Sequence, residues 1–197
     1  MSCGCAETVD FCVKKGETFQ KRFFWSDGTL TSKAISAISQ AAPMVVTATG
    51  HGMVNNWRAA VVSARGMLQA NAEGYPPGAA EWKRVSVIDA NNVQFDEVNS
   101  ADFDAYTSGG FLVYQNPVSL AGAVASLYIR DAPETGTVLA TLTSSPSSGL
   151  LLDDTTKAIT ATLQTAALTW NIGYYDLEVT LTTGRIVQVA YGSISIT

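Results

Sequence analysis

The chain has 197 residues, of which 47% are hydrophobic and only 15% are charged, with a formal net charge of −5. A charged share so far below the usual value of about 25% excludes a disordered chain and favours surfaces that are buried in contacts. The 12 basic residues are scattered singly or in pairs, and no apolar run approaches the ~20 residues of a membrane helix, so we expect neither nucleic-acid binding nor a membrane.

Most of the chain alternates polar and apolar residues with period two, which predicts β-strands joined by turns. The first clear strand covers residues 18–25 and is expected to end at a turn over residues 26–28, because Asp and Gly favour turns. The later strands of the same style are expected at 123–130, 138–143, 158–163, 174–181 and 185–191.

Residues 33–115 differ from the segments on either side in the length of their strands and connections. Short strands alternate there with longer Gly- and Asn-rich connections, and residues 71–81 form a turn-dense loop. A small antiparallel sheet that closes on itself leaves no unpaired edge strands, so this segment predicts a small barrel or compact sandwich. Its strands are expected at 34–39, 44–49, 59–63, 84–88, 93–95 and 111–114.

The fold class that we expect is all-β: an immunoglobulin-like antiparallel β-sandwich with a small β-barrel-like module inserted in a loop. Residues 1–32 would form an N-terminal arm and the first strand of the outer sandwich. Residues 33–115 would form the inserted module, and residues 116–197 the remainder of the sandwich. Insertion at a surface turn costs little, because loop-closure entropy grows slowly with length.

The cysteines are Cys3, Cys5 and Cys12, all within the first dozen residues. An odd number clustered on a terminal segment cannot form a disulfide framework for the body of the fold. They are either free thiols on a flexible or docked arm, or partners in an intersubunit disulfide. Zinc is not expected, because the single histidine, His51, is distant in sequence and the four-ligand spacing is missing.

Catalytic signatures are not found in the sequence. His51 lies between two glycines at a turn, where a local structural role is expected, and there is no nucleophile elbow, phosphate loop or metalloprotease helix. We therefore expect no enzyme, no cofactor and no metal. Acidic residues do gather in predicted turns, where they could cap the backbone, bind calcium or serve glycan hydrolysis: Asp153 with Asp154, Asp102 with Asp104, and Asp131 with Glu134.

Aromatic side chains are the best candidates for contacts with other molecules. Alternation in residues 174–181 places Tyr175, Leu177 and Val179 on a core face and Tyr174 on the opposite face. The alternation continues over residues 193–197, which could form an edge strand open to a neighbour. The candidate contact aromatics are Tyr75, Trp82, Tyr106 and Tyr174.

Two sets of phrases resemble known families. The outer set is VKKGETFQKRFFW, PVSLAGAVASLYIRD, LLLDDTTKAITATL and GYYDLEVTLTTGRIVQVAYGSISIT. It resembles a small sandwich module of bacteriophage structural proteins, including the N-terminal part of baseplate upper proteins. In that family the first strand runs into a phrase like PVSLAGA after a few residues, whereas some eighty residues intervene here.

The intervening residues resemble a second module, the small FCCH-type domain of ubiquitin-activating enzymes, which also occurs in phage tail and virion proteins. The phrases that carry this resemblance are AISAISQAAPMVVTATGHGM, VSVIDANNVQFDEV and FDAYTSGG. The resemblance implies no ubiquitin chemistry, because the catalytic parts of such enzymes lie outside this module. Removing the inner segment restores the spacing of the outer family, so the two resemblances support each other.

Together these resemblances imply a non-enzymatic bacteriophage virion subunit of the tail, baseplate, neck or capsid surface. It would be made in the cytoplasm of the bacterial host and would contact other virion proteins, as a homo-oligomer in a symmetric assembly. One alternative is a tail module that binds a host glycan or receptor through the aromatics of the inserted segment. Another is a cell-wall or capsule-degrading enzyme that uses Asp153 and Asp154.

Overall fold

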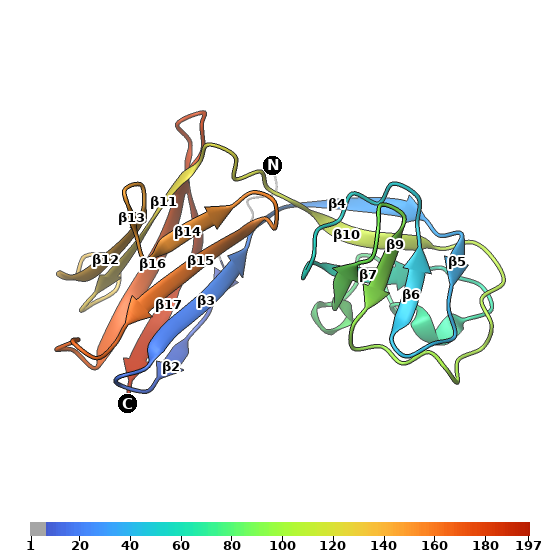
Figure 1. Cartoon of the computed structure of the whole chain (residues 1–197), viewed down its shortest axis with the longest axis horizontal. Helices are drawn as coiled ribbons and strands as arrows, with labels where there is room; N and C mark the ends of the chain where they lie inside the picture. The colour runs from blue at the N-terminus through green and yellow to red at the C-terminus, as the bar shows by residue number, and fades with distance from the viewer. Residues whose placement is uncertain (1–6) are drawn as a thin grey trace. The chain divides into compact units, whose positions relative to one another are not determined.

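The computed structural model describes residues 7–197, and these confirm the all-β fold class, with 52% of the chain in strands and 3% in helices. The chain divides into two compact units (Figure 1). One unit, the sandwich, combines the chain up to Trp25 with Pro117–Thr197, and the other, the barrel, is Ser26–Asn116.

The sandwich consists of two facing sheets (Figure 1). Its smaller sheet has the order β14-β15-β3, and its larger sheet has the order β1-β17-β16-β11-β12-β13, with β2 also paired to β17. The strands are β1 (Glu7–Thr8), β2 (Phe11–Val13), β3 (Thr18–Phe24), β11 (Val124–Arg130), β12 (Val138–Ser144), β13 (Ser147–Ser148), β14 (Leu150–Asp153), β15 (Ala158–Gln164), β16 (Ile172–Thr180) and β17 (Ile186–Ile196).

This strand order has immunoglobulin-like topology, as the sequence predicted. In that fold one sheet contains strands B, E and D, the other contains C, F and G, and variable-type domains add C′. Here β3, β15 and β14 take the places of B, E and D, while β11, β16, β17 and β12 take those of C, F, G and C′. The barrel is therefore an insertion into the connection between β3 and β11 of the sandwich.

Apolar side chains from both sheets fill the space between them. On β16, the side chains of Tyr175, Leu177 and Val179 are buried and those of the alternate residues are partly exposed, which confirms the predicted facing of this strand. They pack against Phe23 on β3 and Ile159 on β15 in one continuous cluster. The period-two pattern thus sets which face of each strand meets the core.

The N-terminal strands run parallel to β17 and cover its outer edge. Phe11 on β2 pairs with Ile194, and Cys12 pairs with Ser195. The prediction of a free edge over residues 193–197 is therefore wrong, because a segment distant in sequence takes that edge. The exposed Cys12 has its Sγ atom 3.9 Å from the Thr197 hydroxyl oxygen, whereas Cys3 and Cys5 lie outside the described residues.

The inserted unit is one sheet with the order β4-β10-β7-β8-β9-β6-β5. Its edge strands, β4 and β5, are separated only by Ile35 and Ser36. The Ile35 N–H donates to the Gly110 carbonyl at 3.1 Å, and the Ser36 N–H donates to the Thr47 carbonyl at 2.9 Å. One chain segment therefore bonds to both ends of the sheet, which closes it into the barrel-like module that the sequence predicted.

The barrel strands are β4 (Ser26–Ala34), β5 (Ala37–Ile38), β6 (Met44–Thr47), β7 (Arg58–Val62), β8 (Lys83–Val87), β9 (Asn92–Phe95) and β10 (Phe111–Pro117), with short 3₁₀ turns η1 (Leu68–Ala70) and η2 (Ala79–Glu81).

The barrel begins at Ser26, so the assignment of residues 26–32 to the sandwich is wrong. Residues 26–28, expected as a turn, lie inside β4. Gly28 takes a positive φ of 78°, and the Asp27 carboxylate accepts the Thr29 N–H at 2.8 Å. The turn-forming residues thus produce a local distortion, and pairing of β4 with β10 keeps the chain extended through it.

A buried hydroxyl ties the N-terminal segment to the sandwich core. The Tyr175 hydroxyl donates to the Val9 carbonyl at 2.8 Å. We predict that Tyr175→Phe lowers the free energy of unfolding by about 1 kcal/mol, because the Val9 carbonyl loses its side-chain donor. Urea denaturation of the full chain measures this, with Tyr174→Phe on the outer face as the matched control. Equal stability of the two variants would contradict the role of this bond.

Candidate interaction surface

The outer face of the larger sheet gathers three tyrosines from three neighbouring strands. The strand register places Tyr128 on β11 opposite Asp176 on β16, and Asp176 opposite Tyr191 on β17. In the next row, Tyr174 lies opposite Arg130. We call these five residues the tyrosine face. The side chains on β11 and β16 point outward because their neighbours in sequence point into the core. On β17, the exposed Tyr191 follows the buried Ala190.

Local contacts hold the charged members of the tyrosine face in place. The Arg130 guanidinium lies 5.4 Å from the centre of the Tyr128 ring and donates to the Gly136 carbonyl at 3.1 Å. The Asp176 carboxylate accepts the Gln188 amide N–H at 2.6 Å. Tyr191 remains 42% exposed. Tyrosine and arginine are enriched at protein interfaces, and pre-positioned side chains lose little entropy on binding.

The other candidate aromatics lie in the barrel, whereas Tyr174 lies in the sandwich. Tyr75 is 63% exposed in the loop of residues 71–81, and Trp82 is partly buried. The Tyr106 hydroxyl lies 3.0 Å from the Ile35 carbonyl oxygen and 2.9 Å from that of Gly109. Tyr106 therefore holds its own loop against the junction of β4 and β5.

Sequence reasoning missed Tyr128 and Tyr191 as companions of Tyr174. Alternation along β11 places Tyr128 on the same side as Arg130, so the pattern alone could have found it. Tyr191 could not be found in this way. The register of β16 with β17 shifts between Leu177 and Glu178, which interrupts simple alternation along β17.

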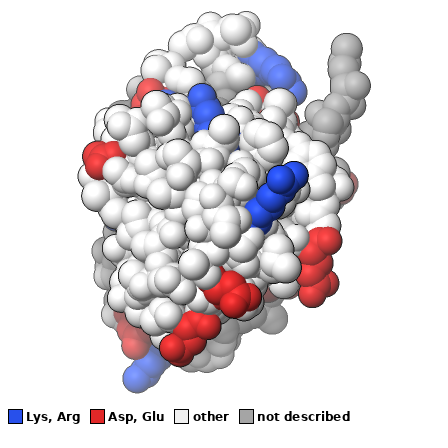
Figure 2. Space-filling view, turned by 90° about the vertical axis from the view of Figure 1, so that its right-hand side faces the viewer, with Lys and Arg blue, Asp and Glu red and all other residues white. Residues whose placement is uncertain are grey.

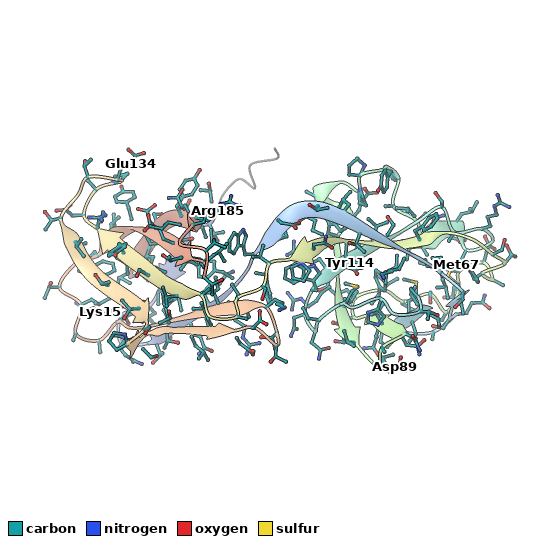
Figure 3. All side chains as sticks on the ribbon, turned by 90° about the horizontal axis from the view of Figure 1, so that it is seen from above. Lys15, Met67, Asp89, Tyr114, Glu134 and Arg185 are labelled. Carbon is teal, nitrogen blue, oxygen red and sulfur yellow. The ribbon has the colours of Figure 1, made fainter. Side chains whose placement is uncertain are left out.

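His51 has a structural role in the barrel. Its side chain is 1% exposed. Nδ1 accepts the Met53 N–H at 3.0 Å, so Nε2 carries the proton and donates to the Asp89 carbonyl at 2.9 Å. The Tyr114 hydroxyl donates to the His51 carbonyl; Figure 3 labels Tyr114 and Asp89 within this unit. Both ring nitrogens are therefore occupied in fixing the turn.

Asp153 and Asp154 are occupied in the turn between β14 and β15. Asp153 accepts the Thr156 hydroxyl at 2.7 Å, and this hydrogen bond is the main cause that lowers its pKa. Asp154 contacts the Lys157 ammonium at 2.6 Å, which is the main cause that lowers its pKa, and accepts the Leu120 N–H at 2.6 Å. A catalytic acid of a glycosidase needs a raised pKa, and neither carboxyl has a shift in that direction.

The other acidic pairs also lie in turns and loops. The Asp131 carboxylate accepts the Thr137 N–H at 2.7 Å across the turn that contains Glu134. Asp104 accepts the Gln69 amide N–H at 2.9 Å, and Asp102 is exposed beside it in sequence. Figure 3 labels Glu134 and Arg185, which the antiparallel register of β11 with β16 puts at opposite ends of the sandwich.

Within residues 7–197, no group of three or more His, Cys, Asp or Glu side chains is arranged to hold a metal ion. In the same part of the chain, no helix is long and apolar enough to cross a membrane. Most of the face seen in Figure 2 is uncharged, and its basic side chains lie apart from one another.

Comparison with known proteins gives no assignment. No protein-family model matches the sequence, and no curated protein matches it. The two resemblances to phage modules therefore stay predictions, and the functional interpretation depends on the residues and their geometry.

The turn around Asp154 gives a pH-dependent prediction. Because its pKa is lowered in the folded chain, Asp154 stabilises the fold above its ordinary pKa of 3.8, and this contribution is lost as the pH falls through the lower folded value. We predict that Asp154→Asn lowers Tm at pH 6 and that the difference shrinks toward pH 2. Thermal melts over this range measure it. Asp102→Asn is the control, and a pH-independent difference would contradict the prediction.

Proposed function

We propose that the chain is a non-catalytic structural subunit of a bacteriophage virion that acts through protein–protein contacts. It would be made in the cytoplasm of the bacterial host and would occupy the tail, baseplate, neck or capsid surface. The tyrosine face is the observation that carries this proposal, because it offers aromatic and arginine anchors on a rigid sheet. The two nested resemblances in the sequence support the same class of protein.

The hydrogen bonds that the acidic pairs accept fit a contact role of the chain better than a catalytic one. Asp153 and Asp154 already accept hydrogen bonds from the turn that they cap. The tyrosine face combines the positive Arg130 with the negative Asp176, so it suits either another virion protein or a second copy of this chain. Virion positions repeat by symmetry, which favours a homo-oligomer.

Substitution of two members of the tyrosine face, the partly exposed Tyr174 and the exposed Tyr191, tests the proposal. We predict that Tyr174→Ser with Tyr191→Ser weakens self-association of the purified chain at least tenfold, because interface anchors typically contribute more than ~1 kcal/mol each. Sedimentation equilibrium measures the association. The same variant should be depleted from particles purified after infection with the encoding phage.

The matched control is Leu151→Ser, which removes an apolar side chain that is 63% exposed on the smaller sheet of the sandwich. It should associate and enter particles as the unchanged chain does. Particles that lack the unchanged chain would contradict the virion assignment. Equal behaviour of the tyrosine variant and the control would instead exclude the tyrosine face as the contact.

A further inference from the structure

The barrel contains a cavity that the proposed function does not use. It lies where the sheet opens: β8 pairs with β7 only through Lys83 and Arg84, and from Val85 onward it pairs with β9. The part of β7 that follows Ala59 is instead hydrogen-bonded to the loop that follows η1, where the Ala72 N–H donates to the Val61 carbonyl at 2.7 Å. The resulting space has a volume of about 340 Å³.

The floor of the cavity is apolar. Met44 on β6, Val61 on β7 and Phe95 on β9 line it, and none of them is more than 2% exposed. Phe103 adds a partly exposed aromatic ring to the wall. Because these three side chains are almost fully covered, the aromatic ring that a ligand can reach is that of Phe103.

Hydrogen bonds also fix the walls. The Glu81 carboxylate accepts the N–H groups of Glu73 and Gly78, and the hydrogen bond from Glu73 is the main cause that lowers the pKa of Glu81. The Asn71 amide exchanges two hydrogen bonds with the backbone of Ala64, at 2.8 and 2.9 Å. Both ends of the loop of residues 71–81 are thereby held at the cavity.

The rim of the cavity has hydrogen-bond donors and acceptors that are available to a ligand. Among the described residues, none donates to the Glu97 carboxylate and none accepts from the Asn99 amide nitrogen, whose own amide oxygen accepts the Ala101 N–H. The Lys83 ammonium gives one N–H to the Ala80 carbonyl at 3.0 Å and has others to donate. The cavity thus presents at least one free acceptor and two free donor groups above an apolar floor.

From this lining we infer that the cavity binds a neutral saccharide, with one sugar ring seated between Phe103 and the polar rim. A sugar ring combines an apolar C–H face with hydroxyls that both donate and accept hydrogen bonds. The rim carries charges of both signs, the carboxylates of Glu81 and Glu97 and the ammonium of Lys83, so it does not offer a charged ligand a field of one sign. The volume lies near the lower end of the ~300–1,000 Å³ range of small-molecule sites, as a single ring requires.

Saturation-transfer NMR on the full chain tests this inference. The neutral probes are methyl glucoside, methyl galactoside and N-acetylglucosamine, and the charged probes are glucosamine and N-acetylneuraminic acid. We predict transfer to at least one neutral probe, with a Kd of roughly 1 mM by calorimetry, as suits a single ring in a shallow site. Transfer to charged probes alone, or to none, would overturn the inference.

Two conservative variants locate the site. Glu97→Gln keeps the size of the side chain and removes its charge, and Phe103→Leu keeps an apolar wall and removes the ring. Each should weaken binding of the neutral probe about tenfold, while Glu134→Gln in the sandwich should leave it unchanged. Unaltered binding in both cavity variants would place the sugar elsewhere and overturn the inference. Because the tyrosine face lies in the other unit, its variants leave this result unaffected.

Discussion

The fold depends on one constraint, which is that the chain leaves and re-enters the sandwich at neighbouring points. The Val118 N–H donates to the Trp25 carbonyl at 3.0 Å, so the residues on either side of the insertion are hydrogen-bonded to each other. The two ends of the barrel segment also lie next to each other. Its first and last strands, β4 and β10, are neighbours in the sheet, and the Ser26 hydroxyl donates to the Gln115 side-chain oxygen at 2.8 Å. Each module can therefore close around its own core.

This arrangement separates the two kinds of surface. The sandwich keeps its immunoglobulin-like sheets, and its larger sheet carries the tyrosine face, which we propose as the contact with another protein. The barrel closes its edges, and the point where β8 passes from β7 to β9 leaves a cavity suited to a small ligand. A loop insertion can thus add a second surface without altering the core of the first module.

The sequence predicted what depends on local periodicity. Alternation around Tyr175 and Leu177 correctly assigned the faces of β16, and the short strands of the inserted segment correctly indicated a barrel. The errors arose where distant residues decide the outcome. Pairing with β10 keeps residues 26–32 in an extended strand, and β2 covers the end of β17. The partners of Tyr174 and the cavity around Phe103 also depend on strand register and loop packing, which no single segment encodes.

Excision of the barrel tests most directly the claim that two self-contained modules are nested. A chain in which a short Gly-Ser linker replaces residues 26–116 joins Trp25 to Pro117 across a gap that one backbone hydrogen bond already spans. We predict that this chain unfolds cooperatively on heating and keeps the dispersed NMR spectrum of a β-sandwich. Residues 26–116 expressed alone should fold as well. An excised sandwich without cooperative unfolding or dispersed resonances would show that the barrel is part of one common core and would contradict the nesting of two self-contained modules.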